Sequence, residues 1–414
     1  MRGLVATLPV LDLALGAVEA VRAAARRAGA EGPVVDAPLD PARVAASFAS
    51  DRLLRLDGEA WVPFGPHSGF FRTCDGWVRT HANYPHHRVR LLRSLDLPDA
   101  AGRTEIAARL AASSAQAVED SACAEGAVAV RVRTEAEWRA SPAGRAAALG
   151  PLVRIEPRTD GRADRPVRIG SGEQPLAGIQ VLDLTRVVAG PVATRTLALL
   201  GADVLRVDPP EPAEIGVQHL DTGQGKRTVV LDLRDSDDRH VAQRLLDAAD
   251  VLVTGYRPGA IERLGLRRPE GIVRARVSAW GQGGPWAARR GFDSIVQAAC
   301  GIALVESADG VTPGALPAQA LDHATGYLLA AGVVDALTAV ARDGVGRDVV
   351  ASLARTATWL LDAPGRDPYH RTPATPSGSL TVTHDGVTTA RPALPVDDYP
   401  SPAHPWGSDE PGWG

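Results

Sequence analysis

The sequence predicts an α/β protein with a Rossmann-like parallel sheet, crossover helices and a smaller α+β domain. From residue 178 onward, short runs of β-branched residues alternate with helical patterns, which is typical of a parallel sheet with crossover helices. A second set of strand and helix patterns occupies residues 60–150, and 414 residues exceed what one hydrophobic core usually organises. The predicted strands are 179–184, 203–207, 228–233, 251–254 and 272–278, and the predicted helices are 191–200, 237–248 and 260–264.

The order of these elements predicts where a ligand binds. Ligands of open parallel sheets lie beyond the carboxyl ends of the strands. We therefore expect the site to be lined by the loops that begin at Thr185, Asp208, Gly255 and Ala279.

The chain divides into five predicted parts. Residues 1–60 form an N-terminal helical segment, residues 61–155 a smaller domain, and residues 156–175 a linker dense in Arg, Asp, Gly and Pro. Residues 176–362 form the Rossmann-like domain, and residues 363–414 form a Pro- and Gly-rich tail that we expect to wrap the surface without a core of its own. A weak internal repeat relates residues 16–35 to residues 332–350.

Charge and composition exclude several classes of partner. A net charge of -4 leaves no electrostatic footprint for nucleic acid or an anionic membrane surface. No run of about 18 uncharged apolar residues occurs, so no membrane span is expected. The three cysteines, Cys74, Cys123 and Cys300, form no CxxC pair and have no closely spaced histidine partners, which argues against disulfides and a zinc site. We expect a cytoplasmic protein that uses no metal and no redox cofactor.

A helix that begins at Gly190 and Pro191 follows the first predicted strand. Proline suits the first helical turn, and the free amides there attract an anion such as phosphate. Of the three glycines that mark a dinucleotide site, only Gly190 is present, so a nicotinamide dehydrogenase is a poor interpretation. Asp208 stands where a ribose-binding acid lies in such folds, and the chain's only lysine, Lys226, lies in a basic turn. Exposure to solvent is the commoner explanation of both side chains.

Aromatic and basic residues follow the fourth predicted strand. Tyr256 and Arg257 come directly after it, and Arg263 lies on the short helix beyond. An aromatic face and guanidinium groups near strand ends suit an adenine ring and a phosphate, respectively.

Asp322 is the candidate reactive group. It lies near the start of a long apolar helix that runs toward Ala341, where free amides and the helix dipole are expected to lower its pKa and keep it an oxygen nucleophile. The same placement is common for a helix N-cap, so capping is the more frequent role when the residues are considered alone. The adjacent His323 points in a different direction on a helix, and we treat it as a bystander.

Five segments resemble the family III CoA-transferases, which include carnitine, bile-acid and formyl-CoA transferases and the α-methylacyl-CoA racemases. The segments are 182–191, 200–208, 225–233, 249–259 and 291–298, and their order and spacing extend the resemblance over residues 176–360. The resemblance implies an acyl-CoA:carboxylate CoA-transferase. Its substrates would be an acyl-CoA and a carboxylic acid, with no tightly bound cofactor.

The resemblance also assigns roles to residues. The family's catalytic aspartate falls on Asp322, which overrides the capping interpretation, and its carboxylate would attack the thioester carbonyl to give an aspartyl mixed anhydride and CoA thiolate. By the resemblance, the CoA-binding residues fall into three groups. The backbone would approach the pantetheine at Val187, Val188 and Ala189. The nucleotide would be contacted by Tyr256 and Arg263, and Arg290 stands where some members use a basic side chain.

The chain departs from the family's pattern at two site positions and in the order of its parts. Racemases place a histidine where this chain has Phe292, so a racemase would lack its second base and transfer is the preferred interpretation. Some transferases place a glutamine where this chain has Val188. The smaller domain also precedes the aspartate here, although it follows the aspartate in the family, so the chain resembles a back half joined to a front half.

Two alternatives to transfer remain open at this stage. One is an acyl-CoA racemase or isomerase, and the other is a non-catalytic CoA-binding partner subunit. A homodimer is implied by the resemblance, but the rearranged order of the halves argues against the family's interlocked ring.

Overall fold

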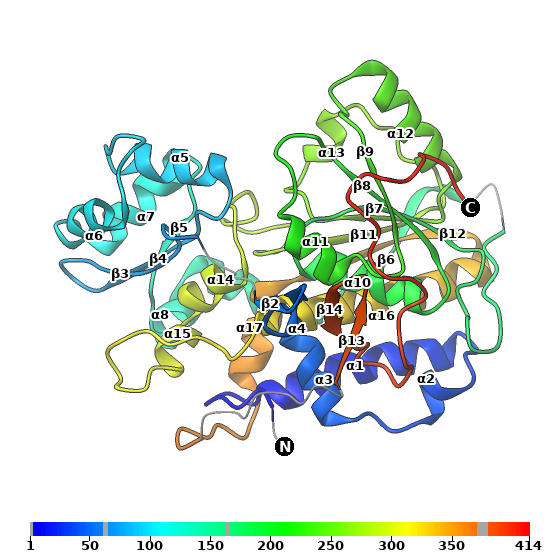
Figure 1. Cartoon of the computed structure of the whole chain (residues 1–414), viewed down its shortest axis with the longest axis horizontal. Coiled ribbons are helices and arrows are strands. Elements are labelled where there is room, and N and C mark those ends of the chain that lie inside the picture. Colours follow the sequence, from blue (N-terminus) through cyan, green and yellow to red (C-terminus); the bar gives the residue numbers. More distant parts are fainter. Residues whose placement is uncertain (1–2, 61–64, 163–165, 371–379) are drawn as a thin grey trace.

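A seven-stranded sheet forms the centre of the protein. The computed structural model describes residues 3–60, 65–162, 166–370 and 380–414. The strands of the sheet are β6 (Val153–Arg162), β7 (Gln180–Leu184), β8 (Asp203–Asp208), β9 (Arg227–Val230), β10 (Val251–Thr254), β11 (Val273–Ser278) and β12 (Val345–Ser352). They run in the order β6-β12-β11-β10-β7-β8-β9, and all neighbours are parallel except β6, which is antiparallel to β12 (Figure 1).

The predicted parallel sheet with crossover helices is confirmed. Each of the five predicted strands corresponds to one of the strands β7 to β11, with bounds that shift at the ends. The three predicted helices correspond to α10 (Ala189–Leu199), α12 (Ser236–Ala248) and α13 (Ala260–Arg263). The sequence did not predict β12, whose Gly346, Arg347 and Asp348 weaken the strand pattern. Asp348 is satisfied within the sheet, because Arg274 on β11 forms an ion pair with it.

The predicted linker at 156–175 is wrong at its start, since β6 continues to residue 162. This strand lies at the edge of the sheet and pairs with β12 alone. Edge strands tolerate proline and charged side chains because one side of the backbone faces away from the sheet. The composition that indicated a linker therefore belongs in part to an edge strand.

The long helix α16 (Ala320–Asp343) packs against α10, α1 (Val10–Arg27) and the strands β11 and β12 (Figure 1). Among the described helices it is the one long and apolar enough to cross a membrane. Most of its residues are buried inside the protein, as in the core helix of a globular domain. Burial on all sides explains why its sequence is apolar throughout.

A smaller module stands beside the large sheet and has a hydrophobic core of its own (Figure 1). Its antiparallel sheet consists of β3 (Gly69–Arg72), β4 (Trp77–Thr80) and β5 (Ala129–Arg131). The helices α5 (Pro85–Ser94), α6 (Arg103–Ala111), α7 (Ala115–Ala124), α8 (Glu135–Ala140) and α9 (Pro142–Ala147) accompany it. The connecting helices elsewhere are α11 (Gly216–Thr222), α14 (Asp293–Cys300), α15 (Ile302–Val305) and α17 (Leu353–Asp362).

The two ends of the chain meet in a third sheet. The N-terminal segment contains α2 (Pro33–Asp36), α3 (Pro41–Phe48) and α4 (Ser50–Leu53), followed by β1 (Arg55–Leu56) and β2 (Glu59–Ala60). In the tail, β13 (Thr381–His384) and β14 (Val387–Ala390) form a hairpin, and β14 pairs with β1. The tail is therefore more ordered than we predicted, because its strands find a partner more than 300 residues away in the sequence.

The internal repeat holds only for its helices. In the first copy, Val34 and Val35 lie in the short helix α2, whereas the corresponding Val349 and Val350 lie in strand β12. The matching helices α1 and α16 pack against each other. The repeated pattern thus describes two apolar helices and not two copies of a helix-strand unit.

Close packing of α16 against α10 depends on Gly326. A Cβ atom at this position would lie 2.5 Å from the backbone oxygen of Ala189 and 2.9 Å from Cβ of Val192. We expect Gly326→Ala to lower the free energy of unfolding by about 1–3 kcal/mol, because the added methyl group must push two helices apart. Urea denaturation followed by circular dichroism measures this change.

Gly16→Ala is the matched control on α1. No atom lies within 4 Å of a Cβ built at Gly16, so this change should stabilise the helix by about 0.5–1 kcal/mol. Equal effects of the two substitutions would contradict the packing argument.

Candidate active site

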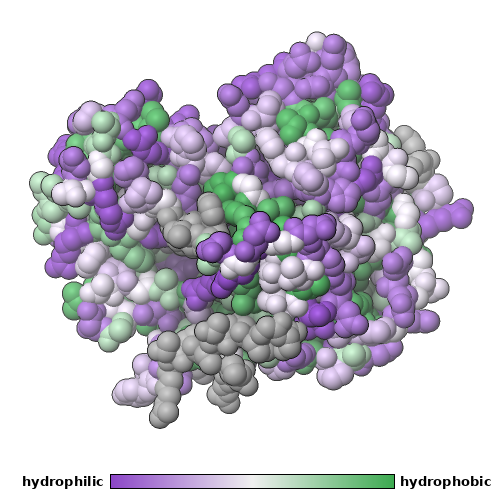
Figure 2. Space-filling model, in the orientation of Figure 1, coloured by the Kyte–Doolittle hydropathy of each residue, from purple (hydrophilic) through white to green (hydrophobic). Residues whose placement is uncertain are grey.

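A cavity of about 480 Å³ opens between the carboxyl ends of the large sheet and the smaller module. Figure 2 shows hydrophobic residues gathered where these two lobes meet. The loops predicted from the strand order line this cavity. The lining segments are residues 186–190 after β7, 207–209 at the end of β8, 231–234 after β9, 255–257 after β10 and 277–280 at the end of β11.

Asp322 lies in the first turn of α16 and lines the cavity. It does not cap the helix, because the N-cap residue is Gln319 and the cap has no side-chain hydrogen bond. The side chain is buried, and its Oδ2 has no hydrogen-bond partner among the described residues. Asp322 therefore presents a carboxyl oxygen that the protein does not engage.

The expected lowering of the Asp322 pKa is wrong. Burial raises the pKa of Asp322 well above its usual value, and the nearby Asp293 carboxylate raises it further. Asp293 is itself buried, and burial raises its pKa to about 6. These effects exceed that of the helix dipole, because a charge deep in a low-dielectric site loses most of its hydration.

Asp293 also positions the start of α16. Its Oδ2 accepts a hydrogen bond of 3.0 Å from the backbone N–H of Asp322. Its Oδ1 accepts a hydrogen bond from Nε2 of Gln297, whose own Oε1 accepts from the backbone N–H of Leu316 at 2.9 Å. The helix α14 thus holds the turn that carries Asp322.

The backbone from Val187 to Ala189 runs along the cavity wall just before α10. Val187 has φ = 72°, a left-handed conformation that is rare for a β-branched residue. Its N–H donates a hydrogen bond of 3.1 Å to Oε2 of Glu214. A conformation of this kind persists only where surrounding contacts enforce it.

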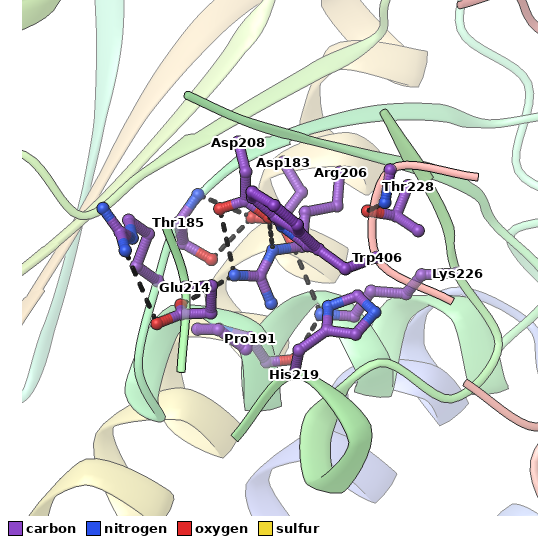
Figure 3. A network of polar contacts seen from close by, with 12 residues as sticks. Asp183, Thr185, Pro191, Arg206, Asp208, Glu214, His219, Lys226, Thr228 and Trp406 are labelled. Carbon is purple, nitrogen blue, oxygen red and sulfur yellow. Dashed lines mark hydrogen bonds and ion pairs between the residues drawn. The ribbon is translucent and has the colours of Figure 1, made fainter. Parts of the chain in front are cut away.

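Those contacts come from a buried network of ion pairs behind the loop (Figure 3). Oε2 of Glu214 lies 2.7 Å from Arg206, and Arg206 lies 2.8 Å from Asp208. Burial raises the pKa of Glu214, but Arg206 and Arg186 outweigh burial and hold this pKa at about 2. Tyr84 of the smaller module donates its hydroxyl hydrogen to Glu214 at 2.7 Å. The network therefore connects the large sheet, the loop and the smaller module.

Solvent exposure is the wrong explanation for Asp208 and Lys226. Asp208 is fully buried and accepts a hydrogen bond of 3.1 Å from Nε1 of Trp406 in the tail, besides its ion pair with Arg206. Nζ of Lys226 lies 3.2 Å from Oδ2 of Asp183 and donates to the backbone oxygen of Pro191 at 2.8 Å (Figure 3). Burial lowers the pKa of Lys226 to about 8, although Asp183 opposes this change. Both side chains are thus buried and paired within the protein, although Asp208 also borders the cavity.

The other predicted CoA-binding residues divide into two groups. Tyr256 and Arg290 line the cavity, and Nη1 of Arg290 donates to the backbone oxygen of Gly126 in the smaller module at 2.7 Å. Burial, together with nearby Arg257 and Arg90, lowers the pKa of Arg290 to about 10. Arg263 is exposed on α13 and is not part of the cavity lining. The structure thus brings Asp322, Val187, Val188, Ala189, Tyr256 and Arg290 together around one space.

Sequence reasoning missed the residues that reach the cavity from the smaller module. These are Tyr84, His86 and His87, at the start of α5. A signal was present, because three histidines and a tyrosine lie within residues 81–87. Asp293 was also missed as the partner of Asp322, since its position 29 residues earlier gives no hint of contact.

A carboxyl group at the wall of a cavity beyond a parallel sheet defines an α/β protein with a ligand site in the usual place for that fold. The model for CoA-transferase family III matches residues 176–383, which is half of the chain. The chain belongs to CoA-transferase family III, and the resemblance drawn from its motifs is confirmed.

Curated relatives carry related names. An acetyl-coenzyme A transferase of Hypoxylon pulicicidum is 35% identical over 222 residues, which are 50% of this chain and 37% of that protein. A probable fatty acyl-CoA transferase of Mycobacterium tuberculosis is 36% identical over 196 residues, which are 43% of this chain and 50% of that protein. The chain thus spans half the length of these relatives or less. A crystal structure of a hypothetical protein from Mycobacterium tuberculosis matches with a TM-score of 0.43 at 35% identity, over 45% of this chain and 57% of the other.

The buried carboxyl pair predicts a gain in stability for Asp322→Asn at high pH. The pKa of Asp322 is higher in the folded protein than in the unfolded chain. The contribution of Asp322 to the free energy of unfolding is therefore fully present below its unfolded-state pKa and is lost as the pH rises through its folded-state pKa. Asparagine does not titrate, so the variant should gain about 1.4 kcal/mol for each unit of the raised pKa. Urea denaturation at pH 4 and pH 8 measures the difference.

The matched control is Asp335→Asn on the same helix. Asp335 lies on the partly exposed side of α16, where it forms an ion pair of 2.8 Å with Arg27. Its loss should change stability by less than about 1 kcal/mol and in the destabilising direction. A gain for Asp322→Asn that is as large at pH 4 as at pH 8 would contradict the assigned pKa direction.

Proposed function

We propose that the protein transfers CoA from an acyl-CoA to a carboxylic acid, with Asp322 as the nucleophile. The observation that supports this most is the unpaired Oδ2 of Asp322 on the wall of a cavity that Val187, Val188 and Ala189 also line. A nucleophile must keep a lone pair free for the substrate, and a carboxylate used only for structure is normally hydrogen-bonded when buried.

In the proposed reaction, an oxygen of Asp322 forms a bond to the thioester carbonyl carbon. The carbon–sulfur bond then breaks, and the electron pair leaves with the CoA sulfur as thiolate. The product on the enzyme is an aspartyl-acyl mixed anhydride. An incoming carboxylate attacks the aspartyl carbonyl carbon of this anhydride and displaces the original acid as its carboxylate, which leaves a new anhydride between Asp322 and the acceptor. The thiolate then attacks the acceptor's acyl carbon, the bond from that carbon to the Asp322 oxygen breaks, and the new thioester and the free Asp322 carboxylate are formed.

The cavity offers a path for the rest of CoA. We propose that the pantetheine follows the backbone at 187–189 and that the nucleotide lies toward Tyr256 and the exposed Arg263. The chain's guanidinium groups Arg257 and Arg290 border the same space, and no salt bridge to a carboxylate engages either of them among the described residues. Arginines that have no carboxylate partner attract phosphate or carboxylate groups of a ligand.

The relatives suggest classes of acid to test. Their names include acetyl-CoA:oxalate CoA-transferase from Acetobacter aceti and succinyl-CoA:glutarate CoA-transferase from Homo sapiens. We therefore place short carboxylic and dicarboxylic acids first among the candidate acceptors for this chain.

Asp322→Ala is expected to abolish transfer while CoA affinity stays within about tenfold of the original, because the change removes a nucleophile and leaves the nucleotide contacts intact. The assay incubates the protein with acetyl-, butyryl-, succinyl- or palmitoyl-CoA, quenches it and locates the acyl mass by peptide mass spectrometry. The label should lie on Asp322 and be released by hydroxylamine. Asp335→Ala is the control on the same helix and should keep its label.

Three results would oppose this function. An Asp322→Ala protein that still transfers CoA would remove the mechanism. Exchange of the α-hydrogen of an acyl-CoA for deuterium, without an acceptor acid and without an acyl label on the enzyme, would favour the racemase or isomerase alternative. CoA binding without any enzyme anhydride would favour a non-catalytic subunit.

Asp293→Asn should move the acid limb of the pH profile to lower pH. The Asp293 carboxylate raises the pKa of Asp322, so its neutral replacement should lower that pKa and leave more nucleophile ionised in mildly acidic solution. The amide oxygen of asparagine can still accept the backbone N–H of Asp322. Measurement of kcat/KM from pH 4.5 to pH 8 tests this, and a limb that stays in place or moves upward would contradict it.

A further inference from the structure

His87 lies on the cavity wall with Asp322, although it comes from the other module of the chain. It belongs to the first turn of α5, where His86 also lines the cavity. The centroids of the two imidazole rings lie 4.1 Å apart. The start of α5 therefore presents two imidazoles to the space in which the substrate is proposed to react.

The ring of His87 is buried without a hydrogen bond. Its exposed fraction is 5%, Nδ1 is buried and lacks a partner, and neither ring nitrogen has a hydrogen bond among the described residues. The buried Nδ1 atoms of His86 and His323 also lack a partner, whereas His219 and His384 each have a hydrogen bond at Nε2. Nε2 of His219 lies 2.8 Å from the backbone oxygen of His404, and Nε2 of His384 lies 2.6 Å from Oδ2 of Asp398. An unpaired buried polar group costs free energy, so its presence beside a cavity points to a ligand that completes it.

Aromatic contacts orient His87 toward the same space as Asp322. Its ring meets the ring of Phe292 edge-on, with the two centroids 5.6 Å apart. The ring of His81 stacks on the same Phe292 ring, with the centroids 3.8 Å apart. Phe292 lines the cavity and directly precedes Asp293, which holds the backbone of Asp322. His87 and Asp322 thus belong to one packed unit and face one cavity.

We propose that His87 donates an N–H hydrogen bond to the carbonyl oxygen of the bound thioester while Asp322 attacks the carbonyl carbon. As the new carbon–oxygen bond forms, the π pair of the carbonyl moves onto its oxygen, and the N–H of His87 stabilises that negative charge. When the carbon–sulfur bond breaks, the carbonyl re-forms and the thiolate carries away the electron pair. His87 keeps its proton throughout, so the step balances without an acid or a base.

The charge state of His87 suits this role. Burial is the main cause that lowers the pKa of His87 to about 2, and His86, His81, Arg290 and Arg90 add to it. The ring is therefore neutral in any ordinary working range, with a hydrogen on one nitrogen. A neutral imidazole that polarises a carbonyl is an established way of stabilising such a charge, and it adds no cation next to the arginines of the cavity.

The inference rests on the proposed function and is tested by single-turnover kinetics. The protein is mixed with the acyl-CoA that labels Asp322 most completely, and formation of the mixed anhydride is followed by rapid quench and mass spectrometry. We expect His87→Phe, which keeps an aromatic ring but removes the donor, to slow anhydride formation about 100-fold with little change in KM. His87→Asn keeps an N–H donor and should react at least about tenfold faster than His87→Phe.

The control is His240→Asn, an exposed position on α12 outside the cavity lining, and its rate should stay within about twofold of the original. Thermal melting of each variant separates loss of the donor from loss of the fold. The pH profile of His87→Asn should keep the shape of the original, because neither side chain titrates between pH 5 and pH 8.

Three outcomes would overturn the inference. Anhydride formation in His87→Phe within about twofold of the original rate would show that His87 donates no hydrogen bond that matters to the reaction. An equal loss of rate in His87→Asn and His87→Phe would assign the effect to packing, and a loss confined to KM would assign it to binding. Absence of any anhydride on Asp322 in the unaltered protein would instead overturn the proposed function.

Discussion

The buried ion pairs behind the first crossover loop are the constraint on which the site depends. Glu214 holds the backbone of Val187 and the hydroxyl of Tyr84 while it is itself held by Arg206. Breaking such a buried pair from one side costs about 3–5 kcal/mol, because the remaining charge is left uncompensated. The network therefore stabilises Val187 in its left-handed conformation, and it holds this part of the cavity wall in place.

The burial that leaves one oxygen of Asp322 without a partner also makes ionisation of this residue unfavourable for the stability of the folded protein. Two carboxyl groups, Asp293 and Asp322, lie in a site with little hydration; burial raises the pKa of both, and the Asp293 carboxylate raises the pKa of Asp322 further. The ionised form of Asp322 therefore lowers the stability of the folded protein. Ionisable residues with such perturbed pKa values are concentrated at functional sites, where activity is retained at the cost of stability.

Two modules that are separated in the chain build one cavity. The large sheet contributes its carboxyl-end loops and Asp322, and the smaller module, which comes earlier in the sequence, contributes Tyr84, His86 and His87. Arg290 ties the two together through the backbone oxygen of Gly126. Because the contacts cross between modules, relative movement of the modules would change the distance between His87 and Asp322 and with it the proposed chemistry.

The sequence by itself determined the parallel sheet, its crossover helices, the loops that line the cavity and the family, because hydrophobic periodicity and short motifs are local signals. Local signals also misled: the charges of Asp208 and Lys226 resembled a solvated surface, and the charged strand β6 resembled a linker. Only the tertiary structure decided that Asp208 pairs with Arg206 and Lys226 with Asp183 inside the protein. It also decided that Asp293 lies against Asp322 and that His87 faces the same cavity. Each of these depends on residues distant in the chain, and the pKa of a carboxyl group follows from what surrounds it in space, which the order of residues along a helix does not record.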